Sequence, residues 1–291
     1  MADFESLNPR TGEIIARHEN SSKEAVNSAV AKAADSFKTW GSLKYSERRR
    51  ILLTWKREIS NSSEDFAQLI ALETGKPIGD ARLEVSIAIA HLGWAAKKAE
   101  YYLKASRRKP GLLMFNMQAE VHRIPYGVIG VIGPWNYPMF TPMGSIAYAL
   151  AAGNTVVFKP SEFTPGVGKM LEDTFNKISK VPNVLQTVTG LGETGKALCE
   201  SAISKLAFTG STRTAKLVAE NCAKNMVPVL LECGGKDPVL VDKDANLKLA
   251  AEYTIWSAMA NAGQSCIGAE RVYVHAKVAE KFQSEVLEIV K

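Results

Sequence analysis

The chain has 291 residues, of which 46% are hydrophobic and 23% charged, and it carries a net charge of +6. This length and composition are typical of an ordinary globular protein with about two domains, and they exclude a disordered or fibrous chain. The basic clusters Arg48–Arg50 and Arg107–Lys109 adjoin helical patterns and lack interleaved aromatic residues. They therefore predict solvated helix faces, and we expect no nucleic-acid partner.

The cysteine and histidine spacing predicts a cytoplasmic protein without a metal site. The four cysteines have no CxxC spacing, and the four histidines have no metal-ligand spacing. No apolar signal region opens the chain, and no apolar run reaches the ~18 residues of a membrane helix. We accordingly expect no membrane partner.

The first third of the chain predicts a layer of helices. A turn at Asn8–Gly12 precedes a short strand at 13–18. Ser21 with Glu24 forms a capping-box pattern for a helix that runs to about Phe37. Three more helices are expected: 47–60 with Ser46 as its cap, a third that runs to Gly75, and a long one from Pro77 through Leu103.

An arm is predicted next. Leu112–Asn116 and Ala119–Pro125 have the pattern of two antiparallel strands joined by a short turn. Such a two-stranded unit is only marginally stable alone, so it needs a partner sheet.

From Gly127 the pattern changes to apolar strands that alternate with helices. The predicted strands are 128–132, 155–158, 185–189, 206–208 and 229–232. The predicted helices are 141–152 closed by Gly153, one with Thr164 as cap and Pro165 at its first position, 193–201 and 212–221. This alternation predicts an α/β fold, with a parallel sheet that has helices on both faces. Ligands bind beyond the carboxyl ends of such strands, where each distinctive motif of this region lies.

Two of these motifs offer polar side chains. Gly133–Pro138 follows the first strand, and its prolines stiffen the loop around Asn136, whose amide is suited to donate to an oxyanion. The alternative is a rigid turn with a local hydrogen bond. Lys159 and Glu162 follow the second strand and are suited to bind ribose hydroxyls, the alternative being a solvated surface pair.

Two glycine loops enter helices, namely Gly190, Gly192 and Gly195, and then Phe208–Ser211. Free N–H groups at helix N-termini bind anions, so either loop is suited to a pyrophosphate, although glycine is also the usual turn residue. No acidic residue stands on a strand end ~20 residues later, so the standard dinucleotide fingerprint is not assigned.

A carboxylate and a thiol complete the set. Glu232 leaves an apolar strand for a glycine turn, a position suited to a general base, the alternative being a pair with Lys236. Cys266 follows a helical run, Leu247–Ala260, that Gly263 is expected to end in a left-handed cap. This predicts a thiol on a turn at a cleft, and the alternative is a buried small hydrophobe.

Together these groups converge on one chemistry: thiohemiacetal formation from an aldehyde, hydride transfer to a nicotinamide, and thioester hydrolysis. Over essentially the whole chain the sequence resembles the aldehyde dehydrogenase superfamily. The stretches that carry the resemblance are Pro134–Trp135–Asn136–Tyr137–Pro138, Lys159–Pro160–Ser161–Glu162, Phe208–Thr209–Gly210–Ser211, Leu231–Glu232–Cys233–Gly234–Gly235–Lys236 and Gly263–Gln264–Ser265–Cys266.

The resemblance implies NAD(P)-dependent oxidation of a small-molecule aldehyde to a carboxylic acid. It makes Cys266 the nucleophile, Glu232 the base that activates the hydrolytic water, and Asn136, with the backbone N–H of Cys266, the oxyanion hole. The implied cofactor is NAD, with NADP as the alternative, because a carboxylate such as Glu162 goes with NAD in this family. The implied cofactor-binding residues are Ile132, Gly133, Pro134, Trp135, Lys159, Ser161, Glu162, Gly192, Phe208, Gly210, Ser211, Thr214 and Gly234.

The resemblance also implies a domain organisation. Residues 1–111 and 126–233 would form a Rossmann-like dinucleotide-binding domain, 112–125 an oligomerisation hairpin, and 234–291 the beginning of a second α/β domain, the catalytic one. Ala215 replaces the second glycine of the family's Gly-Ser-x-x-x-Gly turn, which is a mild change. Family members continue well beyond Lys291, so we expect an N-terminal portion whose homodimer or homotetramer is compromised by the missing C-terminal strand.

Two alternatives remain open. One is a truncated, non-catalytic nucleotide-binding fragment. The other is a CoA-acylating aldehyde dehydrogenase, against which Glu232 weighs because such relatives typically lack it.

Overall fold

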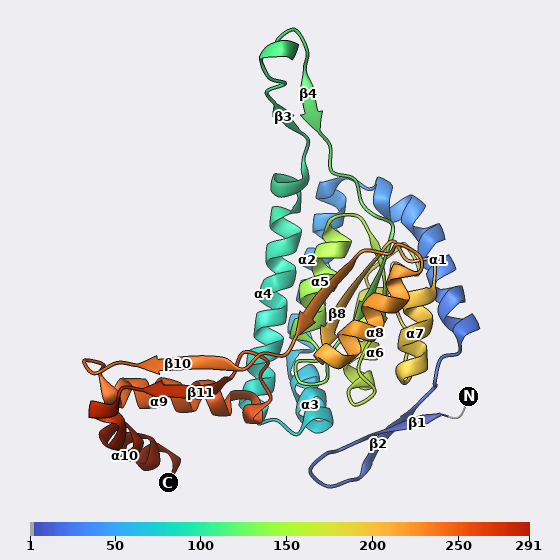
Figure 1. Ribbon diagram of the computed structural model, residues 1–291. Coiled ribbons are helices and arrows are strands. Elements are labelled where there is room, and N and C mark those ends of the chain that lie inside the picture. The colour runs from blue at the N-terminus through green and yellow to red at the C-terminus, as the bar shows by residue number, and fades with distance from the viewer. Residues whose placement is uncertain (1–2) are drawn as a thin grey trace.

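The computed structural model describes residues 3–291 (Figure 1). Its centre is a five-stranded parallel sheet with the strand order β7-β6-β5-β8-β9. The strands are β5 (Val128–Ile132), β6 (Thr155–Lys159), β7 (Leu185–Thr187), β8 (Lys205–Gly210) and β9 (Val229–Cys233). In chain order, β6 and β7 are the first strands added after β5, and both lie on one side of it. The next two strands, β8 and β9, lie on its other side. This reversal creates the switch point at which open α/β sheets bind ligands, and it confirms the predicted Rossmann-like fold.

Helices cover both faces of this sheet. One face packs against α5 and α6, on which α2, α3 and α4 pack in turn, and the other face packs against α1, α7 and α8. Their bounds are α1 (Lys23–Ser42), α2 (Tyr45–Asn61), α3 (Ser63–Thr74), α4 (Ile78–Leu103), α5 (Phe140–Ala151), α6 (Pro165–Asn176), α7 (Gly192–Glu200) and α8 (Thr212–Ala223). Among the described residues, no helix combines the length and apolar character needed to cross a membrane.

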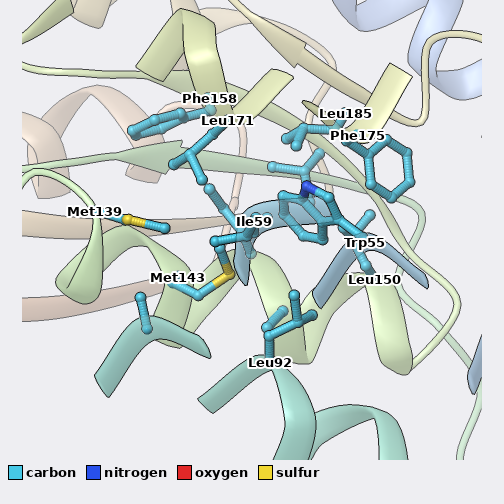
Figure 2. Close-up of a cluster of buried hydrophobic side chains, with 14 of the residues drawn as sticks. Trp55, Ile59, Leu92, Met139, Met143, Leu150, Phe158, Leu171, Phe175 and Leu185 are labelled. Atoms are coloured by element: carbon cyan, nitrogen blue, oxygen red, sulfur yellow. The ribbon is translucent and has the colours of Figure 1, made fainter. Parts of the chain in front are cut away.

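The larger hydrophobic core lies between the sheet and helices α2 to α6. Figure 2 shows part of it, where Trp55 of α2 meets Phe175 of α6 edge to face with ring centroids 5.1 Å apart. The indole N–H of Trp55 donates to Thr174 Oγ1 at 3.0 Å, which satisfies a polar group far from water. β5 and β6 are buried along their whole length. Because helices cover both faces of these strands, most residues that point to either face are apolar, and each strand contains a continuous apolar run.

A smaller unit follows β9. Strands β10 (Asp237–Val241) and β11 (Ala269–Val274) form a separate parallel pair. Helix α9 (Leu247–Met259) packs against this pair, and α10 (Ala279–Val290) packs against α9. The unit has its own small core around Val241, Leu247, Ala251 and Phe282. Figure 1 shows this unit beside the lower end of α4. The sequence analysis predicted neither of these strands, and it also missed β1 (Phe4–Leu7), which pairs antiparallel with β2 (Ile14–His18).

Two predicted helix caps were wrong by one or two residues. The cap of α1 is Ser22, whose hydroxyl accepts from the N–H of Ala25 at 3.2 Å, because Ser21 is held by its own N–H on the carbonyl of Thr189. The cap of α2 is Lys44 and not Ser46. There the Glu47 carboxylate accepts from the Lys44 N–H at 2.8 Å, so the helix begins earlier than predicted.

The arm was predicted with one strand in the wrong place. Strand β3 (Ser106–Arg108) pairs antiparallel with β4 (Ala119–Val121), and the predicted strand at 112–116 is a 3₁₀ turn, Leu112–Met114, at the tip. Gly111 has φ +91°, which breaks the extended chain before the apolar residues are reached. Figure 1 shows the arm projecting from the end of α4, away from the body.

Candidate active site

The loop after β5 joins the turn that precedes Cys266. The side-chain amide of Asn136 donates to the carbonyl oxygen of Gln264 at 2.6 Å, and the amide of Asn261 donates to the carbonyl oxygen of Asn136 at 3.0 Å. These bonds link segments more than 120 residues apart in sequence. The alternative of a purely local turn at Asn136 is therefore wrong.

The turn itself has an uncommon backbone. Asn261, Ala262 and Gly263 all have left-handed φ values, of +59°, +57° and +72°. The predicted left-handed conformation of Gly263 is confirmed. Asn261 and Ala262 adopt the same conformation, which costs a non-glycine residue about 1 kcal/mol each. Hydrogen bonds offset this cost, because the N–H of Asn261 donates to Asp80 Oδ2 at 2.9 Å and the N–H of Gln264 donates to the carbonyl of Asn261 at 3.1 Å.

Cys266 is exposed, so the alternative of a buried small hydrophobe is wrong. Its carbonyl oxygen accepts from the N–H of Gly235 at 3.2 Å. Gly235 lies three residues after Glu232, which is exposed at the end of β9. The segments that carry the carboxylate and the thiol therefore meet. Lys236 forms its ion pair with Glu270, so the alternative pairing with Glu232 is also wrong.

Tyr137 adds a second contact between the two loops. Burial raises the pKa of the Tyr137 hydroxyl, and the side chain of Ser265, next to the thiol, lies near enough to oppose that rise. The ammonium of Lys76 lies 4.5 Å from the centre of its ring. The loop after β5 thus touches both residues that precede Cys266.

Three residues predicted for the cofactor form one row across the sheet. Ile132 pairs in register with Lys159 on one side and with Phe208 on the other, at or near the carboxyl ends of their strands. The N–H of Gly133 donates to the carbonyl of Lys159 at 3.0 Å, and Glu232 follows on the next strand, opposite Thr209. The structure thus brings the strand-end motifs to one edge, as the α/β pattern predicts.

The Lys159 ammonium is buried, with 5% of its side chain exposed, and burial lowers the pKa of the group. It donates to the carbonyl of Pro160 at 3.0 Å and lies 3.6 Å from Glu162 Oε2. The alternative of a solvated surface pair is therefore wrong for the lysine, although the Glu162 side chain is 40% exposed. The neighbouring Ser161 hydroxyl accepts from the N–H of Phe163 at 3.3 Å.

Two helices begin beside this row. Gly192 is the first residue of α7, with nothing near the position that its Cβ would take, and Gly234 is equally open. Ser211 caps α8, its hydroxyl accepting from the N–H of Thr214 at 3.2 Å. A side chain at Gly210 would lie 2.6 Å from the Phe208 ring, so glycine is required there. Pro134 is buried and Trp135 is 43% exposed at the start of the Asn136 loop.

The sequence analysis missed the residues whose side chains form hydrogen bonds with the backbone of the Asn136 loop and of the turn before Cys266. These are Lys76, Asp80 and Glu84, at or just before the start of α4, and Asn261 in the turn. Glu84 left a signal, because it falls on the buried face of α4 beside Ala81 and Ala88. Lys76 left none, since a lysine between two helices is ordinarily solvated.

Comparison with known proteins identifies the family of the chain. A family model described as the aldehyde dehydrogenase family matches residues 1–291. A D-glyceraldehyde dehydrogenase (NADP(+)) of Picrophilus torridus is 33% identical over 99% of this chain and 58% of its own length. Human 4-trimethylaminobutyraldehyde dehydrogenase is 34% identical over 97% of this chain and 56% of its own length.

Solved structures match equally well. The crystal structure of PnpE in complex with nicotinamide adenine dinucleotide, a protein from a Pseudomonas species, superposes with a TM-score of 0.95 at 34% identity. The match covers 100% of this chain and 59% of that one. An NAD-dependent aldehyde dehydrogenase from Sinorhizobium meliloti gives a TM-score of 0.94 at 32% identity, over 99% of this chain and 58% of that one. The chain thus spans somewhat more than half the length of these relatives. It belongs to the aldehyde dehydrogenase family.

Proposed function

We propose that this protein oxidises an aldehyde to a carboxylic acid with NAD(P), using Cys266 as nucleophile. The observation that carries the proposal is the 2.6 Å hydrogen bond that holds the Asn136 amide against the turn of the exposed Cys266 thiol. A nucleophile and a side-chain donor for the developing oxyanion are the minimum for acyl chemistry on a cysteine.

The first step is attack of the Cys266 thiolate on the aldehyde carbon. The new C–S bond places a negative charge on the former carbonyl oxygen, which the second N–H of the Asn136 amide and the backbone N–H of Cys266 are proposed to stabilise. The amide has two N–H groups, and the Gln264 carbonyl engages one of them. A fixed donor of this kind contributes on the order of 3 kcal/mol to transition-state stabilisation.

Glu232 is proposed as the base for the second half of the reaction. It lies at the end of β9, whose continuation is hydrogen-bonded to the Cys266 backbone through Gly235. From there it would take a proton from the water that attacks the thioester, so that the acid leaves and the thiolate returns. A carboxylate at this place favours hydrolysis over transfer to CoA.

The residues at the strand ends fit a dinucleotide. Lys159 is a buried cation that uses one donor on Pro160, which leaves donors for ribose hydroxyls. The first turn of α7 lies against it, and α8 begins at the same edge of the sheet, beyond β5. Residues Gly192, Gly210, Ser211, Thr214 and Gly234 would surround the phosphates and the nicotinamide end, with Ile132, Gly133, Pro134, Trp135 and Phe208 along the row and Ser161 near the lysine. When bound, the nicotinamide supplies the hydride acceptor.

We further propose NAD as the preferred cofactor. Glu162 lies 3.6 Å from the Lys159 ammonium, where its charge would accept a hydrogen bond from a ribose 2′-hydroxyl and repel a 2′-phosphate. Among the relatives, two are named for NADP(+) and one solved structure is named for NAD, so both cofactors occur in the family.

The domain boundaries were expected at 1–111 and 126–233 for the cofactor, 112–125 for an arm that pairs with another subunit, and 234–291 for the start of the catalytic domain, and they remain our proposal with one change. Because β3 (Ser106–Arg108) is the first strand of the arm, we move the start of the arm from 112 to 106. The separate sheet and core of residues 237–290 support the boundary near 234. Leu113 at the tip of the arm is 97% exposed, which fits a segment that a second copy covers.

The decisive experiment replaces the thiol. Cys266→Ser is expected to abolish aldehyde-dependent NADH formation while NAD binding, measured by fluorescence quenching, is unchanged. Cys233→Ser is the matched control, because Cys233 is the other exposed cysteine. Aldehyde oxidation that survives in Cys266→Ser would overturn the proposal, and a product that forms only with added CoA would assign the CoA-acylating reaction instead.

A further inference from the structure

A buried ion pair lies beneath the Asn136 loop. Lys76 Nζ contacts Glu84 Oε2 at 2.6 Å, and neither side chain has any exposure to solvent. The same ammonium donates to the carbonyl oxygen of Asn136 at 2.7 Å. Burial lowers the pKa of Lys76, and the negative charge of Glu84 opposes that effect.

The partner carboxylate holds the other end of the loop. Glu84 Oε1 accepts from the N–H of Met139 at 2.8 Å and from the N–H of Phe140 at 3.1 Å, at the N-terminus of α5. A carboxylate is favourable there because the first N–H groups of a helix have no partner within the helix. Lys76 and Glu84 together therefore fix both ends of residues 136–140.

Asp80 and Asn261 extend this network to the turn that precedes Cys266. Asp80, one turn before Glu84, accepts from the N–H of Asn261 at 2.9 Å. The Asn261 amide then donates to the same Asn136 carbonyl that Lys76 contacts, at 3.0 Å. With two donors, that carbonyl has no freedom to turn, and the side chain of Asn136 is held toward Gln264.

Stability alone does not account for this pair. Removing two charges from water is costly, and apolar side chains of similar volume often stabilise a fold as well as a buried ion pair does. The hydrogen bonds from Lys76 and Glu84 to the loop are what apolar residues could not provide. We propose that Lys76, supported by Glu84, is a positioning residue that aims the Asn136 amide at the reacting carbonyl on Cys266.

This inference rests on the proposed function for the role of the Asn136 amide, and its test separates positioning from charge balance. Lys76→Met leaves Glu84 buried and unpaired, so it is expected to lower both the Tm and kcat. The double variant Lys76→Met/Glu84→Gln removes that charge, and a glutamine oxygen still accepts from Met139 and Phe140. We expect it to recover most of the Tm lost by Lys76→Met, while kcat stays roughly ten- to a hundredfold below wild type with KM little changed.

The control is Lys177→Met, the same substitution in an exposed ion pair with Glu58, and it is expected to behave like wild type. If the double variant regains the wild-type kcat, Lys76 acts only by balancing charge, and the proposal is overturned. A double-mutant cycle tests the same point independently. In an Asn136→Ala background the two substitutions are expected to lower kcat by less than about twofold, because the group that they position is gone. A full, additive loss would contradict the proposal.

Amide hydrogen exchange provides a readout without aldehyde or cofactor. In the double variant, deuterium uptake across residues 259–268 is expected to rise, because the Asn136 loop no longer holds that turn, while uptake in α6 is unchanged. Unchanged uptake across 259–268 would overturn the positioning role. A wild-type protein that oxidises no aldehyde would contradict the proposed function and leave this exchange result as the independent test of positioning.

Discussion

The backbone N–H of Gly235 donates a hydrogen bond of 3.2 Å to the carbonyl oxygen of Cys266. It connects the chain that leaves the cofactor sheet at Glu232 with the chain that carries the thiol. A Cβ at Gly235 would lie 3.1 Å from the same oxygen, so the two segments approach more closely than most residues allow. Motion of the carboxylate segment relative to the thiol segment is restricted as a result.

Glu232→Gln is expected to stop the reaction after acylation. The amide cannot take a proton from water, so the steady-state kcat should fall by about a hundredfold or more, while a burst of NADH equal to the enzyme concentration remains. Stopped-flow absorbance measures the burst. Glu270→Gln is the control because Glu270 pairs with Lys236 at the surface. An unchanged steady-state rate would remove Glu232 from the mechanism, and a lost burst would mean that it activates the thiol.

Asn136→Ala is expected to lower kcat by about a hundred- to a thousandfold, because one oxyanion donor is removed. KM for the aldehyde should change little, since the donor acts mainly in the transition state. Asn225→Ala, which removes an exposed amide bonded to the carbonyl of Glu200, serves as the control. Steady-state kinetics measure both parameters. A rise in KM with kcat unchanged would contradict the assigned role.

Glu162→Gln is expected to narrow the preference for NAD over NADP by roughly tenfold, or about 1.4 kcal/mol, because the charge that repels a 2′-phosphate is removed. Titration calorimetry with both cofactors gives the ratio of the two Kd values. Glu220→Gln is the control, as Glu220 is an exposed carboxylate near the C-terminal end of α8, away from the strand ends. The same Kd ratio in wild type and Glu162→Gln would show that Glu162 does not discriminate.

Glu73 predicts a pH dependence of stability. It is buried between α3 and α6, it accepts from the N–H groups of Gly166 and Val167, and burial raises its pKa to about 7. Between pH 4.5 and 7 the carboxyl is protonated in the folded protein and ionised in the unfolded one. Its contribution to the free energy of unfolding is therefore complete below pH 4.5 and is lost as the pH rises to 7, by on the order of 3 kcal/mol.

Urea unfolding of wild type and Glu73→Gln across this range isolates that contribution. The difference between the two proteins should change with pH, because glutamine stays neutral throughout. Glu58→Gln, at a half-buried carboxylate of α2 that pairs with the exposed Lys177, controls for the loss of a carboxylate charge. Parallel pH profiles for wild type and Glu73→Gln would show that Glu73 stays ionised when folded.

The sequence alone determined the sheet and the edge at which the motifs gather. β5 and β6 were predicted to within one residue, because their apolar runs are local and their burial on both faces leaves no polar alternation. The places of Asn136 and Glu232 followed from the same pattern, since loops at the carboxyl ends of parallel strands must meet at one edge. The sequence placed Cys266 only on a turn after a helix that Gly263 ends, and the structure brings that turn to the Asn136 loop.

Only the tertiary structure decided what holds these loops. The contact of Lys76 with the carbonyl of Asn136 spans 60 residues, and that of Asn136 with Gln264 spans 128. Hydrogen bonds between residues so far apart produce no periodic pattern in the sequence, because each depends on how two helices or loops pack together. The pairing of β10 with β11 across α9 was likewise decided by packing, although the valines of both segments are typical of strands and the sequence analysis overlooked them. Local pattern thus determined which elements form, and packing between distant elements decided where the reactive groups point.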